Sequence, residues 1–245
     1  MGPRFPNFIG IGAQKGGTTT LHAWLKTHPE AYLPNEKEIH FFDQNFEKGN
    51  VWYQNKFKDA KKQQICGEIT PYYLYHPKAA TRINITIPNC KLIVMLRDPV
   101  ERTISQLLHS QKRGFEPLTM EDALNAEKDR LASNSETSLQ KHSYVSRSKY
   151  LSQLTAYERY WHQEQILILK SEDVFENTLQ NWIKIQEFLG IKVLPLADHP
   201  IPTENRNTQA RDNDEFKSIR KRLRSELSKE AWLIKKKYGI SWEWQ

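Results

Sequence analysis

Short apolar runs alternate with longer amphipathic stretches along this chain. The apolar runs have the length of strands, and one of them, residues 91–96, contains almost no polar side chain. Strands that are buried on both faces of a parallel sheet show this pattern. Strands are therefore predicted at residues 8–12, 65–70, 91–96 and 165–169. Apolar side chains recur at helical spacing between them, and helices are predicted at residues 18–28, 77–85, 99–114, 119–132, 148–161, 179–189 and 215–238.

This alternation predicts an α/β fold, with a P-loop-like parallel β-sheet of about four to five strands and helices on both faces. We find no internal repeat and no linker, so residues 1–245 are expected to form a single domain. Two segments interrupt the pattern. Residues 133–142 are polar and poor in apolar side chains, which predicts a flexible loop, and residues 195–214 form a second predicted loop.

Composition and charge exclude several classes of protein. The chain is 38% hydrophobic and 27% charged, which is typical of a globular protein, and its net charge is +7. Much of the basic excess lies in two runs that are most simply solvated helix faces, and no nucleic-acid module is recognisable, so no nucleic-acid partner is expected. No apolar run approaches membrane-spanning length. The two cysteines fall in or beside predicted strands, which favours reduced thiols and a cytoplasmic location.

The most informative segment is FIGIGAQKGGTTT, residues 8–20. Here Lys15, Gly16 and Gly17 join an apolar run to a helical pattern. Such a turn directs backbone N–H groups and the positive end of a helix at one point, which predicts a phosphate or sulfate site. The nucleoside-triphosphate loop G-x-x-x-x-G-K-[ST] requires lysine where Thr18 stands. The segment therefore indicates phosphate chemistry but not a standard ATPase or GTPase.

Polar side chains follow three of the predicted strands. Lys15 follows the first strand, Glu68 lies near the end of the second, and Arg97 ends the third. Ligands of parallel α/β sheets bind beyond the carboxyl ends of the strands, so we expect these groups to converge. Ser105 follows Arg97 on the next helix, and an arginine fork with a hydroxyl suits a terminal phosphate.

The Lys-Gly-Gly-Thr turn, the arginine-aspartate-proline run and Ser105 together resemble the sulfotransferase superfamily. Its members move a sulfuryl group from 3′-phosphoadenosine 5′-phosphosulfate (PAPS) to an alcohol or amine. Residues 37–43 (KEIHFFD) and 67–73 (GEITPYY) are similar to segments of the branch that contains the heparan sulfate sulfotransferases and many bacterial relatives. The cysteine pair and membrane anchor of the Golgi relatives are absent, which suits a soluble bacterial-type member.

The resemblance implies how the donor is bound. Lys15 would stabilise the leaving phosphate, and Arg97 and Ser105 would hold the 3′-phosphate. Arg206 would belong to a loop that closes over the nucleotide. The remaining residues of the 5′-phosphosulfate loop would be Gly16, Gly17, Thr18 and Thr19.

The resemblance also implies the acceptor side. Glu68 is expected to be the general base that takes the acceptor's proton. Lys37, His40 and Tyr72 are expected to bind the acceptor. Ile69 stands where the related segment carries a lysine, so a polysaccharide contact through that lysine is not expected here.

The expected function is therefore in-line sulfuryl transfer from PAPS, with PAP (3′-phosphoadenosine 5′-phosphate) as product, to a hydroxyl or amine of an unidentified small-molecule or saccharide acceptor. Neither the histidines nor the cysteines have metal-ligand spacing, and no metal is expected. Two alternatives remain open: a nucleotide kinase with an aberrant phosphate loop, and a non-enzymatic binder of nucleic acid or anionic surfaces through the basic helix at 215–238. The sequence does not indicate an oligomeric state.

Overall fold

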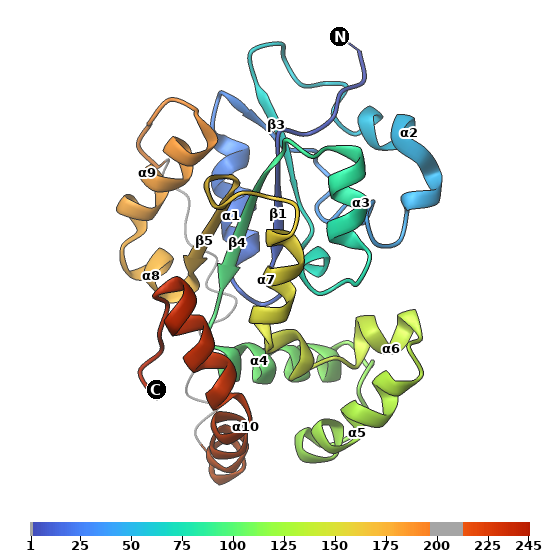
Figure 1. Cartoon of the computed structure of the whole chain (residues 1–245), viewed down its shortest axis with the longest axis vertical. Coiled ribbons are helices and arrows are strands. Elements are labelled where there is room, and N and C mark those ends of the chain that lie inside the picture. Colours follow the sequence, from blue (N-terminus) through green and yellow to red (C-terminus); the bar gives the residue numbers. More distant parts are fainter. Residues whose placement is uncertain (1, 197–212) are drawn as a thin grey trace. The chain divides into compact units, whose positions relative to one another are not determined.

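A computed structural model describes residues 2–196 and 213–245 (Figure 1). These residues form two compact units. The first comprises residues 2–96 and 154–196, and the second comprises residues 97–153 and 213–245. Arg206, the residue expected to close over the nucleotide, lies outside the described residues.

The first unit contains a five-stranded parallel sheet in the order β2-β3-β1-β4-β5. The predicted α/β fold is thus confirmed. Gly10 of β1 pairs with Ile69 of β3 on one side and with Ile93 of β4 on the other. The strands are β1 (Phe8–Gly12), β2 (Ala31–Tyr32), β3 (Ile65–Ile69), β4 (Lys91–Leu96) and β5 (Ile166–Lys170).

Helices cover both faces of this sheet (Figure 1). On one face, Ile93 and Met95 of β4 pack in a core with Trp24 of α1 and Trp182 of α9. Leu92, which alternates with them, is also fully buried, as expected for a strand covered on both sides. The helical segments of this unit are α1 (Thr18–Thr27), η1 (Phe46–Lys48), α2 (Gly49–Asn55), η2 (Pro71–Leu74), α3 (Ala79–Thr86), η4 (Gln163–Gln165), α8 (Ser171–Glu176) and α9 (Thr178–Leu189), and α7 (Tyr150–Glu158) ends in it.

The second unit is helical in its described residues. Its core joins Ile104 and Leu107 to Leu124 and to Leu223 and Leu227, so three amphipathic helices bury their apolar faces together. The helices are α4 (Pro99–Lys112), α5 (Met120–Ala132), α6 (Glu136–Lys141), η3 (Ser146–Ser148) and α10 (Asp214–Tyr238), and α7 begins here.

Two helix starts agree with the capping signals in the sequence. The carboxylate of Asp98 accepts hydrogen bonds from the backbone N–H groups of Val100 and Glu101, with Pro99 at the first position of α4. The hydroxyl of Thr119 caps α5 by accepting from the backbone of Asp122.

The flexible loop predicted at 133–142 is wrong, because Glu136–Lys141 forms α6. The hydroxyl of Ser135 caps this helix, and the guanidinium of Arg147 donates to the carbonyls of Leu139 and Gln140 near its end. The helix presents no apolar stripe that periodicity could reveal. It depends on bonds from a residue outside itself, which a local pattern does not contain.

No helix in the described ranges combines the length and the apolar character needed to cross a bilayer.

Candidate functional site

The turn after β1, residues 13–17, is held by bonds to two other elements. The backbone N–H of Ala13 donates to the carbonyl of Met95 at 2.9 Å, and the hydroxyl of Ser171 donates to the carbonyl of Gly16 at 2.7 Å. The turn therefore lies at the carboxyl end of β1, against the ends of β4 and β5, which is where parallel α/β sheets bind their ligands.

The two glycines of this turn have no side chains that would cover its backbone. A Cβ added to Gly16 would lie 2.4 Å from the carbonyl oxygen of Met95, so no other residue fits. Gly17 has φ 89°, and a Cβ there would lie 2.8 Å from the Phe175 ring. Gly17 precedes α1, whose first turn receives no side-chain cap from the described residues. First-turn amides lack partners within a helix, so this site fits a phosphate or sulfate group.

Lys37 connects a second segment, residues 37–43, to this site. Its ammonium donates to the hydroxyl of Thr19 in the first turn of α1 at 2.7 Å, and it lies 3.3 Å from the carboxylate of Glu38. From the sequence, Lys37 was expected to bind the acceptor and Thr19 to bind the donor. The structure brings the two together.

Three charged side chains of the 37–43 segment form a network. One imidazole nitrogen of His40 is hydrogen-bonded to Asp43 at 2.6 Å, and the other lies 3.6 Å from Glu38. Burial lowers the pKa of His40, but hydrogen bonds and charges from Asp43 and Glu38 outweigh burial and raise that pKa to about 9. Burial likewise opposes the charge of Glu38, but His40 and Lys37 outweigh it and lower the pKa of Glu38. Glu38 is therefore a carboxylate at neutral pH, and its side chain is 34% exposed.

The backbone is strained at the same residues. Among the described non-glycine residues, four have positive φ, and three of them are Lys15 (69°), Glu38 (61°) and His40 (54°). Residues with side chains rarely adopt this conformation, and it persists where the surrounding structure enforces it, often at functional sites. The strain thus marks Lys15 and the 37–43 segment as one candidate site.

Glu68, the expected general base, lies at the end of β3 but is only 2% exposed. Its carboxylate accepts hydrogen bonds from the hydroxyls of Tyr53 (2.7 Å), Tyr73 (2.9 Å) and Thr70 (2.6 Å). Burial raises the pKa of Glu68 to about 7, although the three hydrogen bonds act in the opposite direction. A general base must approach the acceptor's proton to about 3 Å, and three protein hydroxyls already surround this carboxylate.

The hydroxyls bound to Glu68 also hold the 37–43 segment. The hydroxyl of Tyr73 accepts from the backbone N–H of Phe41 at 2.8 Å, and the hydroxyl of Thr70 accepts from that of His40 at 3.5 Å. Each hydroxyl therefore donates to Glu68 and accepts from the segment. This arrangement lets Glu68 fix the position of the charged network without touching a substrate.

Tyr72, expected at the acceptor, is 6% exposed. Its ring lies against the rings of Tyr75 and His76, at centroid distances of 6.2 Å and 5.6 Å. Little of the ring is available to a ligand.

Arg97 and Ser105, the expected 3′-phosphate residues, belong to the second unit. Arg97 directly follows β4, and its carbonyl accepts from the hydroxyl of Tyr150 at 2.9 Å. Ser105 is 3% exposed on α4. Because Lys15 lies in the first unit, their joint binding of one nucleotide stays a prediction.

Arg102, between these two residues, is fully buried. Its guanidinium donates to the hydroxyl of Ser148 at 2.6 Å and to the carbonyl of Tyr144, but its Nη1 has no hydrogen-bond partner among the described residues. Burial lowers the pKa of Arg102 to about 10, and the charges of Arg147 and Arg97 act in the same direction. This buried cation beside other arginines adds positive potential to this part of the second unit, which favours an anion there.

Sequence reasoning missed Glu38 and the role of Arg102. The signal for Glu38 was present, because this acid stands between Lys37 and His40, two residues already expected at the site. For Arg102 the sequence carried no signal, because an arginine within a helical pattern is usually exposed and nothing near it in the chain indicates its burial.

The His40 network predicts a pH-dependent stability. The pKa of His40 rises from 6.5 to about 9 on folding, so its contribution is complete below pH 6.5 and is lost as the pH rises through 9. The unfolding free energy of the wild type minus that of His40→Gln should therefore shrink across this range. Urea unfolding of both proteins from pH 6 to pH 10 measures it, and a constant difference would contradict a protonated His40.

A family model for the sulfotransferase domain matches residues 6–238. Membrane-associated sulfotransferase kil1 of Dictyostelium discoideum is 43% identical over 104 residues, which are 41% of this chain and 22% of that protein. Heparan sulfate glucosamine 3-O-sulfotransferase 3B1 of Mus musculus is 32% identical over 201 residues, 80% of this chain and 49% of that protein. The chain thus spans about half the length, or less, of these relatives.

Solved structures share the fold. A sulfotransferase from Alicyclobacillus acidocaldarius superimposes with a TM-score of 0.79 at 23% identity, covering 98% of this chain and 99% of that one. Mouse sulfotransferase SULT7A1 complexed with PAP superimposes with a TM-score of 0.52 at 16% identity, covering 91% of this chain and 65% of the mouse chain.

Proposed function

Because the chain belongs to the sulfotransferase domain family, we propose that it transfers a sulfuryl group from PAPS to a hydroxyl or amine of an acceptor. One observation carries this proposal. The 2.7 Å bond from Lys37 to Thr19 brings an ionised carboxylate, Glu38, next to a bare helix start that suits a phosphate or sulfate. An anion site and a proton acceptor are the two parts that sulfuryl transfer needs.

The donor would be held from both ends. PAPS supplies the sulfuryl group and a phosphate leaving group. The amides of Gly17–Thr19 and the ammonium of Lys15 bind its 5′-phosphosulfate, and Gly16, whose own amide donates to the carbonyl of Ala13 at 2.9 Å, shapes the turn. Lys37, through its contact with Thr19, lies on the same side and adds positive charge there. Arg97 and Ser105 bind the 3′-phosphate, and the buried positive charge of Arg102 favours an anion in that region.

Glu38, in place of Glu68, would be the general base. Glu38 is ionised and partly exposed, whereas Glu68 is buried and already accepts hydrogen bonds from three hydroxyls. Glu38 takes the acceptor's proton as the acceptor's bond to sulfur forms. Lys15 stabilises the negative charge that grows on the 5′-phosphate oxygen as its bond to sulfur breaks. Glu68 acts as a positioning residue, through Tyr73 and Thr70.

The acceptor would be a saccharide. Beside the 37–43 segment, the ring of Trp52 stacks near that of Phe41 at 6.1 Å. Lys48 and Lys56 lie 4.6 Å and 4.4 Å from the centre of the Trp52 ring. Lys56 is also paired with the carboxylate of Glu36, whereas the ammonium of Lys48 beside an indole suits a saccharide that carries negative charge. Heparan sulfate relatives support the same class.

The test is binding of the product nucleotide. PAP at about 100 times its Kd should stabilise the folded protein by about 2.7 kcal/mol, because it binds only the folded state. Thermal unfolding measures this without added metal. Adenosine 5′-monophosphate, which lacks the 3′-phosphate, should stabilise far less. Stabilisation by ATP with Mg²⁺ instead of PAP would support the kinase alternative, and stabilisation by an oligonucleotide alone would support a nucleic-acid binder.

A further inference from the structure

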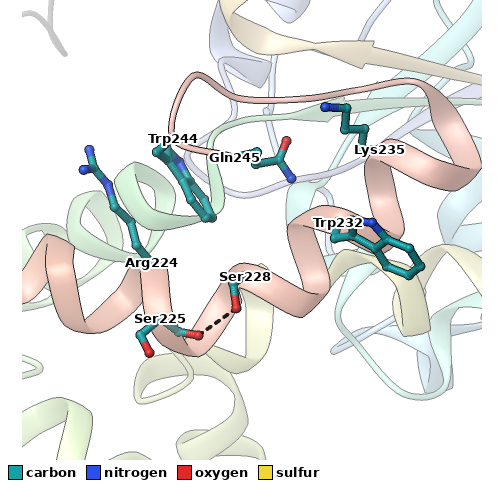
Figure 2. Close-up of a pocket in the computed structure, with 7 residues that line it drawn as sticks. All are labelled: Arg224, Ser225, Ser228, Trp232, Lys235, Trp244 and Gln245. Carbon is teal, nitrogen blue, oxygen red and sulfur yellow. Dashed lines mark hydrogen bonds between the residues drawn. The ribbon is translucent and has the colours of Figure 1, made fainter.

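A pocket of about 460 Å³ lies in the second unit, outside the residues discussed so far (Figure 2). One wall is the C-terminal half of α10, and the other is formed by Trp244 and Gln245. Its volume falls in the range of small-molecule sites, about 300–1,000 Å³.

The second wall is held in place by specific bonds. The indole N–H of Trp244 donates to the carboxylate of Asp98, the cap of α4, at 2.7 Å. The backbone N–H of Trp242 donates to the side-chain oxygen of Gln245 at 2.9 Å, and Trp242 is 5% exposed. These bonds indicate a formed pocket rather than a loose end of the chain.

The pocket is positively charged. Arg224 and Lys235 are the lining residues with charged side chains, and no aspartate or glutamate belongs to the described lining. They are eleven positions apart on α10, which places their backbones about 16 Å apart along the helix. A ligand that meets both must carry negative charges at a similar spacing, which suits an oligomer.

The lining between these cations is aromatic and hydroxylic. Trp232 is 55% exposed, and Lys236 lies 5.2 Å from its ring centre. The hydroxyl of Ser228 donates to the carbonyl of Ser225 at 3.0 Å and keeps its lone pairs for an incoming donor (Figure 2). Single-stranded nucleic acids stack successive bases on several aromatic rings. Of the two tryptophans in this pocket, only Trp232 is well exposed, because Trp244 is half-buried, so the lining does not offer the series of rings that successive bases need.

We propose that this pocket binds an acidic oligosaccharide. The apolar face of one sugar ring packs on Trp232, sugar hydroxyls donate to Ser228, and sulfate or carboxylate groups meet Arg224 and Lys235. None of the residues that line the pocket is among those proposed for sulfuryl transfer, and its occupancy does not require that activity.

Calorimetry of the full chain with a heparin-derived dodecasaccharide tests the proposal. The double variant Arg224→Ala/Lys235→Ala is compared with Lys221→Ala/Lys229→Ala. All four residues are exposed on α10, and both variants lose two charges, but only the first pair lines the pocket. The first variant should bind at least about tenfold more weakly than the wild type, a loss of about 1.4 kcal/mol. The control should stay within about twofold.

A third variant, Trp232→Ala, separates stacking from charge. It should also bind several-fold more weakly, and unchanged thermal unfolding will show that each variant folds. Three results would overturn the proposal: no binding by the wild type, equal weakening in both double variants, or binding of a single-stranded 12-nucleotide DNA as tight as that of the saccharide.

Discussion

Replacing Glu38 with glutamine is expected to lower kcat by about 10²–10⁴-fold, the usual contribution of a general base. Glutamine has nearly the same shape but cannot accept a proton. The lowered pKa of Glu38 keeps the wild-type side chain ionised at neutral pH, so the loss should persist across the neutral range. Initial rates of PAP formation from PAPS, with a chemically desulfated heparan oligosaccharide as acceptor, measure the effect.

Glu68→Gln is the matched comparison. Glutamine at this position keeps an oxygen that can accept from Tyr53 and Tyr73, so we expect less than about a tenfold change in kcat together with a loss of stability. If Glu68→Gln instead lost as much activity as Glu38→Gln while unfolding like the wild type, Glu68 would be the base and the present assignment would be wrong.

The second large effect is expected from Lys15→Ala, which should lower kcat by about 10²–10³-fold. The ammonium of Lys15 is proposed to meet charge that develops on the leaving phosphate, so its removal should affect turnover more than binding of the product. Lys15 has φ 69°, and alanine meets the same backbone restriction, so the substitution adds little strain. Calorimetry with PAP and steady-state rates together separate the two contributions.

Lys26→Ala provides the control, because Lys26 is an exposed lysine in the last turn of α1 and its loss changes the net charge equally. It should leave both parameters unchanged. A Lys15→Ala variant with weaker PAP binding but an unchanged kcat would mean that Lys15 binds ground and transition states alike, and would contradict its proposed role.

Much of the fold could be predicted because its signals are local. The run at 91–96 is apolar after Lys91, and β4 has these bounds. Asp98 and Pro99 mark a helix start through their own backbone and side-chain chemistry, and the structure has the cap there. The resemblance to sulfotransferases, and to the heparan sulfate branch, is confirmed by the family match and by the relatives.

The errors and omissions have long-range causes. β2 has two residues, too few for a periodic pattern, and depends on its pairing with β3. α6 depends on bonds from Arg147. The partners that surround Glu68 include Tyr53, fifteen residues earlier in the chain, so its burial could not be inferred from the GEITPYY segment alone.

The sequence by itself determined the parallel sheet, the glycine turn and the family, because strand burial, glycine backbone freedom and the turn into a helix are properties of neighbouring residues. Only the tertiary structure decided which of two glutamates is available to a substrate. Glu38 and Glu68 both belong to segments that resemble sulfotransferases, and the ionisation of each glutamate is set by the residues that pack around it. For Glu38, Lys37 and His40 outweigh burial and lower the pKa, and for Glu68, burial outweighs three hydroxyl hydrogen bonds and raises the pKa.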